Sequence, residues 1–252
     1  MVSRRPTVAW LGVTLLAGTA ACSLSPVHRK IAVGEEAFVV FVAEGSNGHT
    51  DLFASVAAGG TPVRLTFTTL AEELPRLSPA GDVVAFARSR GDLPARDLVV
   101  LNLLNGAERL LELPEEHGAI TAIGWRDDGT AVYVATGEQA WHVTAPPARL
   151  QVTMLSGPGA DSARTAFTTR LGTPVFATAA PCEDGGICVT GPSGEPARIA
   201  ASGTGPFRWG SDSVAWFDAG ELVIRPLGGG TARRMDWGPA VGNPRQGSYA
   251  GP

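Results

Sequence analysis

Two cysteines six residues apart carry the clearest chemical signal in this sequence. Cys182 and Cys188 enclose the turn Glu183-Asp184-Gly185-Gly186-Ile187, which has the composition of a tight hairpin. In an oxidising compartment such a pair forms a disulfide across the hairpin, worth about 2 kcal/mol through loop closure. A metal or redox pair is the less favoured alternative, because the spacing differs from CxxC and no histidine lies nearby.

The residue types that enzymes use for catalysis are present but scattered. The four histidines form neither an HExxH nor a His-x-His motif, so they indicate no metal site. The segment Gly191-Pro192-Ser193-Gly194 lacks the GxSxG spacing of a nucleophile elbow and is typical of a turn. The acidic residues fall mainly in expected turns, where they usually cap or solvate the backbone: Asp82, Asp127, Asp128, Glu183, Asp184 and Asp212. We therefore predict no catalytic residues, no metal and no cofactor.

A set of arginines at comparable places in repeated segments forms a candidate binding face. These arginines are Arg76, Arg126, Arg170, Arg208 and Arg245, and two of them adjoin Trp125 and Trp209. As a basic ring they would bind carboxylates or an acidic protein segment through bidentate hydrogen bonds. The alternative is local pairing with aspartate or solvent, because Arg126 and Arg208 align whereas Arg76 stands two places earlier. The two tryptophans would either stack on a sugar or pack in the core.

The N-terminus has the pattern of an export signal. Arg4 and Arg5 supply a positive segment, and residues 7–19 are apolar apart from their threonines. That stretch is too short to span a bilayer, which needs about 20 apolar residues, but is long enough for a signal peptide. We therefore predict that the protein is exported.

Small residues then lead to Cys22, an ending that resembles the bacterial lipobox apart from Thr19. We predict a signal peptide over residues 1–21, lipidation of Cys22 and a lipid-anchored tether over residues 22–30. The membrane anchor would be stable because a mature lipoprotein carries several acyl chains. Ser23 favours the outer membrane, facing the periplasm, if the bacterium is Gram-negative. Ordinary secretion with cleavage just before the cysteine is the alternative.

Composition and charge narrow the class of the mature chain. The formal charge of −4 becomes −6 when the predicted signal peptide is removed, because Arg4 and Arg5 leave with it and no acidic residue does. An acidic domain of this kind has no electrostatic footprint for nucleic acid. Thirty-two glycines and nineteen prolines imply frequent turns, which favours an all-β fold of many short strands.

One unit recurs over residues 31–252. Its clearest copy has the turn Ser78-Pro79-Ala80-Gly81-Asp82, an apolar strand from Val83 and a further strand from Asp97. The apolar strands of the other copies begin at Ala37, Ala131, Pro174 and Ser213. The period of roughly 40–48 residues is close to the length of a four-stranded propeller blade. Such a blade buries its two faces only against neighbours, so the copies are expected to form a ring.

The SPxGD turn, the apolar strand and the Asp-initiated strand resemble the repeat of the TolB-type β-propellers. The resemblance covers residues 31–252 and implies a single all-β propeller. The tail, residues 241–248, has the pattern of the first strand that copy one lacks, so we expect it to complete that blade and close the ring. Five four-stranded blades follow, or six if the tail forms a degenerate blade of its own. A generic β-sandwich is the alternative fold.

The resemblance also implies protein partners in the cell envelope. We therefore expect a non-catalytic, membrane-anchored binding scaffold, not an enzyme, that contacts an envelope protein through one propeller face. A glycan- or small-ligand-binding propeller is the alternative, with an envelope hydrolase a more distant one. Joint substitution of Arg126 and Arg208 tests the first hypothesis, because a protein partner would cover the whole face.

Overall fold

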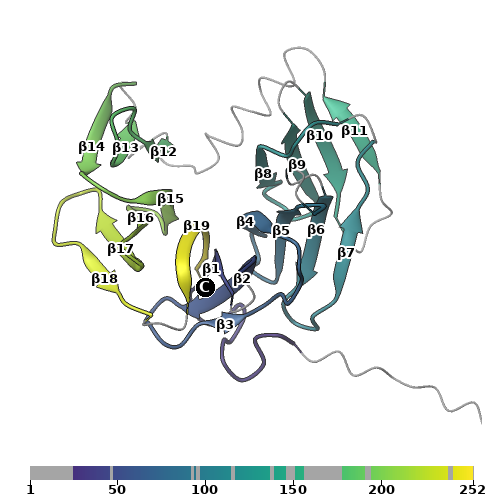
Figure 1. Cartoon of the computed structure of the whole chain (residues 1–252), viewed down its shortest axis with the longest axis horizontal. Coiled ribbons are helices and arrows are strands. Elements are labelled where there is room, and N and C mark those ends of the chain that lie inside the picture. The colour runs from purple at the N-terminus through teal and green to yellow at the C-terminus, as the bar shows by residue number, and fades with distance from the viewer. Residues whose placement is uncertain are drawn as a thin grey trace, which may run out of the picture.

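The described residues form an all-β chain of five antiparallel sheets. A computed structural model describes residues 25–45, 48–91, 94, 97–114, 117–136, 139–145, 151–155, 178–190, 194–237 and 241–251. Figure 1 shows the sheets in an arc around a common centre, each with one edge strand turned towards the middle. This is the blade arrangement that the sequence repeat predicts, and the five-bladed propeller is confirmed.

The strands are given blade by blade, from the innermost outwards. Blade 1 contains β19 (Gly242–Ala250), β1 (Phe38–Glu44), β2 (Thr50–Val56) and β3 (Val63–Arg64). Blade 2 contains β4 (Glu72–Leu77), β5 (Val83–Arg88), β6 (Asp97–Asn102) and β7 (Glu108–Leu111). Blade 3 contains β8 (Ala122–Trp125), β9 (Ala131–Thr136), β10 (Gln139–Thr144) and β11 (Val152–Leu155). Blade 4 contains β12 (Thr178–Pro181), β13 (Ile187–Thr190) and β14 (Pro196–Ala200). Blade 5 contains β15 (Thr204–Trp209), β16 (Ser213–Asp218), β17 (Glu221–Pro226) and β18 (Arg233–Met235).

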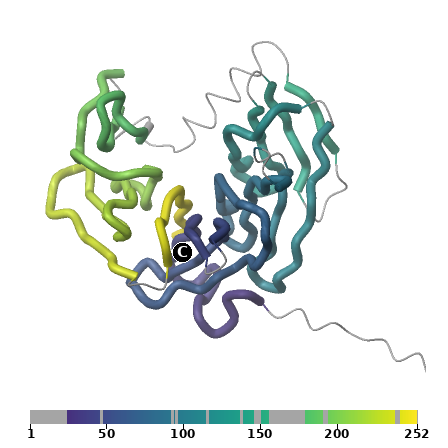
Figure 2. Tube along the Cα trace, in the orientation of Figure 1, coloured from purple at the N-terminus to yellow at the C-terminus, as the bar shows by residue number. Residues whose placement is uncertain are grey.

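The C-terminal strand completes blade 1 as predicted. β19 pairs antiparallel with β1 from Phe38 opposite Ala250 to Glu44 opposite Gly242. Figure 2 shows this last strand beside the first strand, so the two ends of the repeat share one blade. Pairing the two ends covers a strand edge that would otherwise be open. The expected first strand of copy four, with Arg170, lies outside the described residues.

Side-chain alternation along blades 1, 2 and 5 builds a core on both faces of each blade. In β5, Val84 and Phe86 pack against blade 1, whereas Ala85 and Ala87 pack against blade 3. The period-2 geometry of a strand sends successive side chains to opposite faces, so one short strand serves two interfaces. Further cores join blade 5 to blade 1 and blade 4 to blade 5. Most of the burial therefore lies between blades.

Tight turns connect the strands within the blades. Gly81 and Gly129 adopt positive φ values of 74° and 70° in the first turns of blades 2 and 3. A residue with a β-carbon would be strained in this backbone conformation. The predicted disulfide joins Cys182 to Cys188 across the turn between β12 and β13, with a Cα–Cα distance of 5.1 Å. Its role is structural, since it joins two neighbouring strands of one blade.

The innermost strands run parallel to one another, which defines two faces of the ring. The backbone N–H of Leu74 donates to the Gln246 side chain (2.6 Å), and that of Leu77 donates to Ser248 Oγ (3.0 Å), so β4 and β19 advance together. Phe207 of β15 lies against Gly247 of β19, and β15 runs in the same direction as β19. We call the side where β4, β8, β15 and β19 begin the strand-start face, and the side where they end the strand-end face.

The segment Ser25–Ile31 packs on the strand-end face between blades 1 and 2. Val27 is 1% exposed, and Ile31 is buried with it in the core between these blades. Ser25 Oγ donates a hydrogen bond to the carbonyl of Leu103, which follows β6 (2.6 Å). Most of the predicted tether from Ser25 onwards is therefore part of the folded domain, and it is the purple segment beside the first two blades in Figure 2.

Candidate functional site

The structure places the predicted arginines at both ends of the inner strands, so it does not gather them into one ring. Arg76 and Arg208 lie near the ends of β4 and β15, and Arg126 follows β8, all on the strand-end side. Arg245 lies in the first half of β19, opposite Val42 and towards the strand-start face. There it lines a cavity of about 550 Å³ with Glu44 and approaches that carboxylate at 3.8 Å.

Two of the strand-end arginines make local contacts. Arg126 pairs with Asp128 at 2.7 Å, with both side chains about half exposed. Arg208 donates to the carbonyls of Gly210 (2.6 Å) and Ser211 (3.2 Å), which holds the turn after β15. Burial lowers the pKa of the Arg208 guanidinium. For these two arginines the contacts match the alternative to a basic ring, which was local pairing.

Arg76 differs from Arg126 and Arg245 because it has no carboxylate partner among the described residues. Its Nη1 donates to the carbonyl of Pro75 (2.8 Å). Burial lowers the pKa of its guanidinium, since the charged form loses solvation without gaining a counter-charge. Its own carbonyl accepts a hydrogen bond from the Trp125 indole of blade 3 (2.9 Å).

Both candidate tryptophans connect neighbouring inner strands. Trp125 reaches from β8 to β4 through the Arg76 carbonyl, and the Trp209 ring lies 4.5 Å from that of Tyr249 on β19. These are packing contacts of the kind that close a ring of blades. Trp125 has a second role, because its side chain also lines the main pocket described next.

A pocket of about 770 Å³ opens between blades 2 and 3 on the strand-end face. Its walls are the turns that follow β4, β6 and β8, together with Ala145 after β10. The apolar part includes Val83, Val100 and Trp125. We call it the blade 2–3 pocket. Two of its walls are the repeated turns of the sequence motif, 78–82 and 127–129, so the fold brings together turns that stand 49 residues apart in the chain (Ser78 to Asp127).

The blade 2–3 pocket has a small excess of negative charge, because Arg88 and Arg126 pair with two of its carboxylates, Glu108 and Asp128. Four carboxylates line it, and one arginine does: Asp82, Glu108, Asp127, Asp128 and Arg109. Hydrogen bonds from the Thr130 hydroxyl and backbone lower the pKa of Asp128, which keeps that carboxylate ionised. The exposed side chain of Leu104 (57%) stands beside the lining residues Asn102 and Asn105. The pocket thus combines an apolar floor with an acidic rim.

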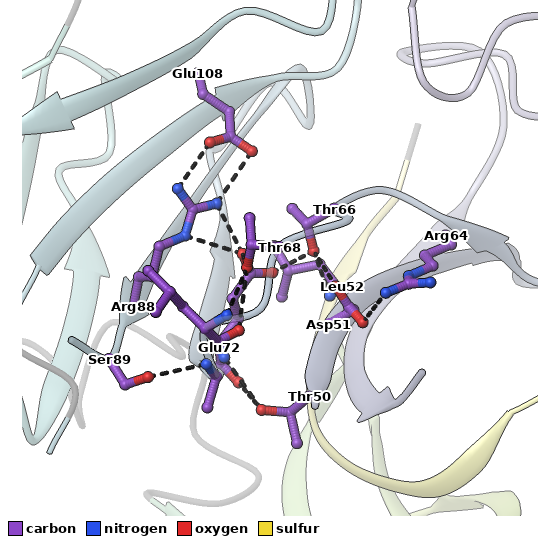
Figure 3. A network of polar contacts seen from close by, with 12 residues as sticks. Thr50, Asp51, Leu52, Arg64, Thr66, Thr68, Glu72, Arg88, Ser89 and Glu108 are labelled. Atoms are coloured by element: carbon purple, nitrogen blue, oxygen red, sulfur yellow. Dashed lines mark hydrogen bonds and ion pairs between the residues drawn. The ribbon is translucent and has the colours of Figure 1, made fainter. Parts of the chain in front are cut away.

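A second polar cluster, buried and missed at the sequence level, lies between blades 1 and 2 near the strand-start face. Glu72, at the start of β4, is fully buried and accepts hydrogen bonds from Arg88 Nε (3.0 Å) and Nη2 (2.7 Å). Arg88 also pairs with Glu108 at 2.9 Å. Thr50 of blade 1 accepts a hydrogen bond from the Glu72 backbone N–H (3.1 Å), so the cluster links the two blades (Figure 3).

Asp51 extends this cluster within blade 1. It is fully buried, pairs with Arg64 and shares the Thr66 hydroxyl with Glu72. Burial raises the pKa of Glu72, against the opposing effects of Thr66 and Arg88. Two carboxylates joined by a hydroxyl resemble an acid–base pair, but neither has any exposed surface, so no substrate can touch them. In the sequence, only Asp51 was marked, as the residue where the repeated Asp-initiated strand was expected to begin. No sequence pattern indicated that Glu72 lies beside it.

The described residues contain no group of three His, Cys, Asp or Glu side chains arranged to hold a metal ion. They also contain no helix long and apolar enough to cross a bilayer. Lipidation of Cys22 lies outside the described residues and stays a prediction.

The fold makes this chain a β-propeller whose first blade is completed by its last strand. No protein-family model matches the sequence, and no curated protein matches it either. The structure is similar to that of a TolB from Agrobacterium tumefaciens described as putative, with 16% identity and a TM-score of 0.40, over 78% of this chain and 60% of that one. It is also similar to TolB from Acinetobacter baumannii (12%, 0.41, over 87% and 67%). A chain of a nidogen/laminin complex gives 14% and 0.39, over 84% and 80%. This chain therefore spans 60% of the length of the first TolB structure.

Proposed function

We propose that this chain is a non-catalytic, lipid-anchored binding scaffold of the bacterial envelope that holds a protein segment on its strand-end face. The observation that carries the proposal is the blade 2–3 pocket, whose volume of about 770 Å³ is typical of a specific binding site. Acidic side chains around an apolar floor suit a peptide better than a uniformly polar ligand.

The docked N-terminal segment supports a defined orientation at the membrane. Cys22 precedes Ser25 by three residues, so their Cα atoms lie at most about 11 Å apart. Ser25 is held on the strand-end face by its hydrogen bond to Leu103. A lipid on Cys22 would therefore keep this face close to the bilayer, where it meets other membrane-attached proteins.

The buried carboxylates support a non-catalytic role. Asp51 and Glu72 share the Thr66 hydroxyl, and each pairs with an arginine. Their position between two blades serves cohesion of the ring. The carboxylates of the blade 2–3 pocket differ, because Asp127 and Asp128 belong to an exposed turn and Glu108 is exposed at the start of β7.

In-cell photo-crosslinking tests the proposal. A photoreactive phenylalanine replaces Asn105, which lines the pocket, or Thr231, which lies in the corresponding loop of blade 5. We expect a distinct envelope protein to crosslink from position 105 and not from position 231. The product should disappear in Cys22→Ala and persist when Arg126 and Arg208 are both replaced by serine, because neither side chain lines the pocket.

Crosslinks that are identical from both positions, or indifferent to Cys22→Ala, would contradict the scaffold. A second candidate, glycan or small-ligand binding, is favoured by Trp125 beside carboxylates in the pocket. It predicts no protein crosslink at position 105 but a rise in melting temperature with peptidoglycan fragments at fixed protein concentration.

A further inference from the structure

One backbone hydrogen bond recurs on the strand-end face of four blades and marks equivalent positions. In each blade the residue after the third strand donates its N–H to the residue just before the second strand, at 2.8 or 2.9 Å. The pairs are Ala57 to Ala37, Leu103 to Asp82, Ala145 to Thr130 and Leu227 to Asp212. Leu103 of blade 2 and Ala145 of blade 3 therefore occupy the same place in their repeats.

Beside Leu103, the chain docks a segment of its own. Val27 and Ile31 are buried between blades 1 and 2, and the Ile31 N–H donates to the Val27 carbonyl (3.1 Å). That single helical turn puts both side chains on one side. The residues between them, His28, Arg29 and Lys30, are exposed. The docked chemistry is thus two aliphatic side chains four positions apart with basic residues between them.

The corresponding place between blades 2 and 3 is the open pocket. By strand register, Val100 and Asn102, which line the blade 2–3 pocket, are the counterparts of Ala54 and Val56. Ala54 and Val56 contribute to the core that receives Val27 and Ile31, and they line the remaining hollow beside Lys30 and Ile31. The same groove is therefore filled in one interface by the chain's own segment and left free in the next.

We propose that the blade 2–3 pocket binds a short segment of a partner protein with two aliphatic side chains four residues apart and basic residues between them. The proposal rests on the scaffold function and names the chemistry of its partner. Four carboxylates line the pocket against Arg109, and Arg88 and Arg126 pair with Glu108 and Asp128, which leaves one negative charge in excess and favours a cationic segment over an anionic lipid headgroup. The aliphatic side chains would pack on the floor formed by Val83, Val100 and Trp125. Val27 and Ile31 pack in the equivalent way between blades 1 and 2.

The probe is the chain's own sequence supplied in trans. A fluorescein-labelled peptide of residues 23–33, SLSPVHRKIAV, is titrated with the full chain in non-ionic detergent and followed by fluorescence anisotropy. We expect saturable binding that weakens with salt, because charge attraction contributes. Peptides in which Arg29 and Lys30 are glutamate, or Val27 and Ile31 are serine, should bind at least about tenfold more weakly.

A pair of matched variants locates the binding. Ala107 is exposed and lines the pocket, so Ala107→Trp fills it without disturbing the core. Ala232, also exposed, precedes β18 just as Ala107 precedes β7, so Ala232→Trp is the same change on the same face of blade 5. We expect Ala107→Trp to weaken peptide binding at least about tenfold and Ala232→Trp to leave it unchanged.

The proposal is overturned if the peptide does not bind, or if both tryptophan variants behave alike. Binding that survives Ala107→Trp would also overturn it, because the peptide would then be exchanging with the chain's own segment between blades 1 and 2. Peptide binding at the pocket without an anchor-dependent crosslink in cells would contradict the scaffold function while leaving the pocket chemistry intact. A crosslinked partner without peptide binding would contradict the pocket chemistry while leaving the scaffold function intact.

Discussion

The interface between blades 1 and 2 and the interface between blades 2 and 3 are built from the same repeat but finished differently. The first is closed at both ends, by the Glu72–Arg88 cluster near the strand-start face and by Val27 and Ile31 at the strand-end face. The second shares the same kind of aliphatic core but opens into a pocket at the strand-end face. Repetition supplies the groove, and the non-repeated residues decide whether it serves stability or binding.

The largest effect is expected from breaking the closed interface at its charged end. Arg88→Met leaves Glu72 buried without its main counter-charge, so the free energy of unfolding should fall by about 3–5 kcal/mol in urea denaturation. Arg90→Met is the control, because the exposed Arg90 pairs with Asp97 at the surface and should cost less than about 1 kcal/mol. Equal losses would show that the cluster does not hold the blades together.

The apolar end of the same interface should give the next largest effect. Val27→Ala removes two methyl groups from a fully buried site, which should cost about 1.5 kcal/mol. Lys30→Ala changes an exposed residue of the same segment and should alter stability by less than about 0.5 kcal/mol. Urea denaturation of both variants measures the difference. If Val27→Ala is as mild as Lys30→Ala, the segment is not part of the folded domain.

A smaller loss is expected on the open interface. Trp125→Phe removes the indole hydrogen bond to the Arg76 carbonyl and should cost about 1 kcal/mol. Trp209→Phe, at the last residue of the equivalent strand β15, keeps an aromatic ring against Tyr249 and should cost less. Thermal unfolding of the two variants compares them directly. A larger loss for Trp209→Phe would mean that ring packing, not the hydrogen bond, holds the inner strands.

The smallest effect is expected in the dependence of stability on pH. Burial raises the pKa of Glu72 above its ordinary value of 4.5, so the folded protein holds this proton more tightly than the unfolded chain does. The resulting stabilisation is complete below pH 4.5 and is lost as the pH rises through the raised pKa. The stability of the natural protein relative to Glu72→Gln should therefore fall as the pH rises above 4.5. A difference that grows with pH would mean that Arg88 and Thr66 outweigh burial.

The repeat, its closure and the disulfide were all predictable from local pattern. Alternation such as Val84-Ala85-Phe86-Ala87 indicates a strand with two buried faces, and the missing first strand of copy one indicated what residues 241–248 do. The candidate site was predictable only in part. Trp125 does line the pocket, whereas the arginines do not form a common site, because a small shift in register or an adjacent aspartate changes where each guanidinium lies.

The sequence by itself determined the blade repeat and its period, because the hydrophobic alternation and the turn residues act over a few positions. The structure decided between five and six blades, because β19 pairs with β1 and forms no blade of its own. Only the tertiary structure decided which grooves are filled. Residues 25–31 have the composition of a tether, yet Val27 and Ile31 are buried because the ring presents an apolar groove beside Leu103. Glu72 likewise gains its role from Arg88 and from Thr50 of another blade. Such contacts depend on distance in space, which a one-dimensional pattern does not encode.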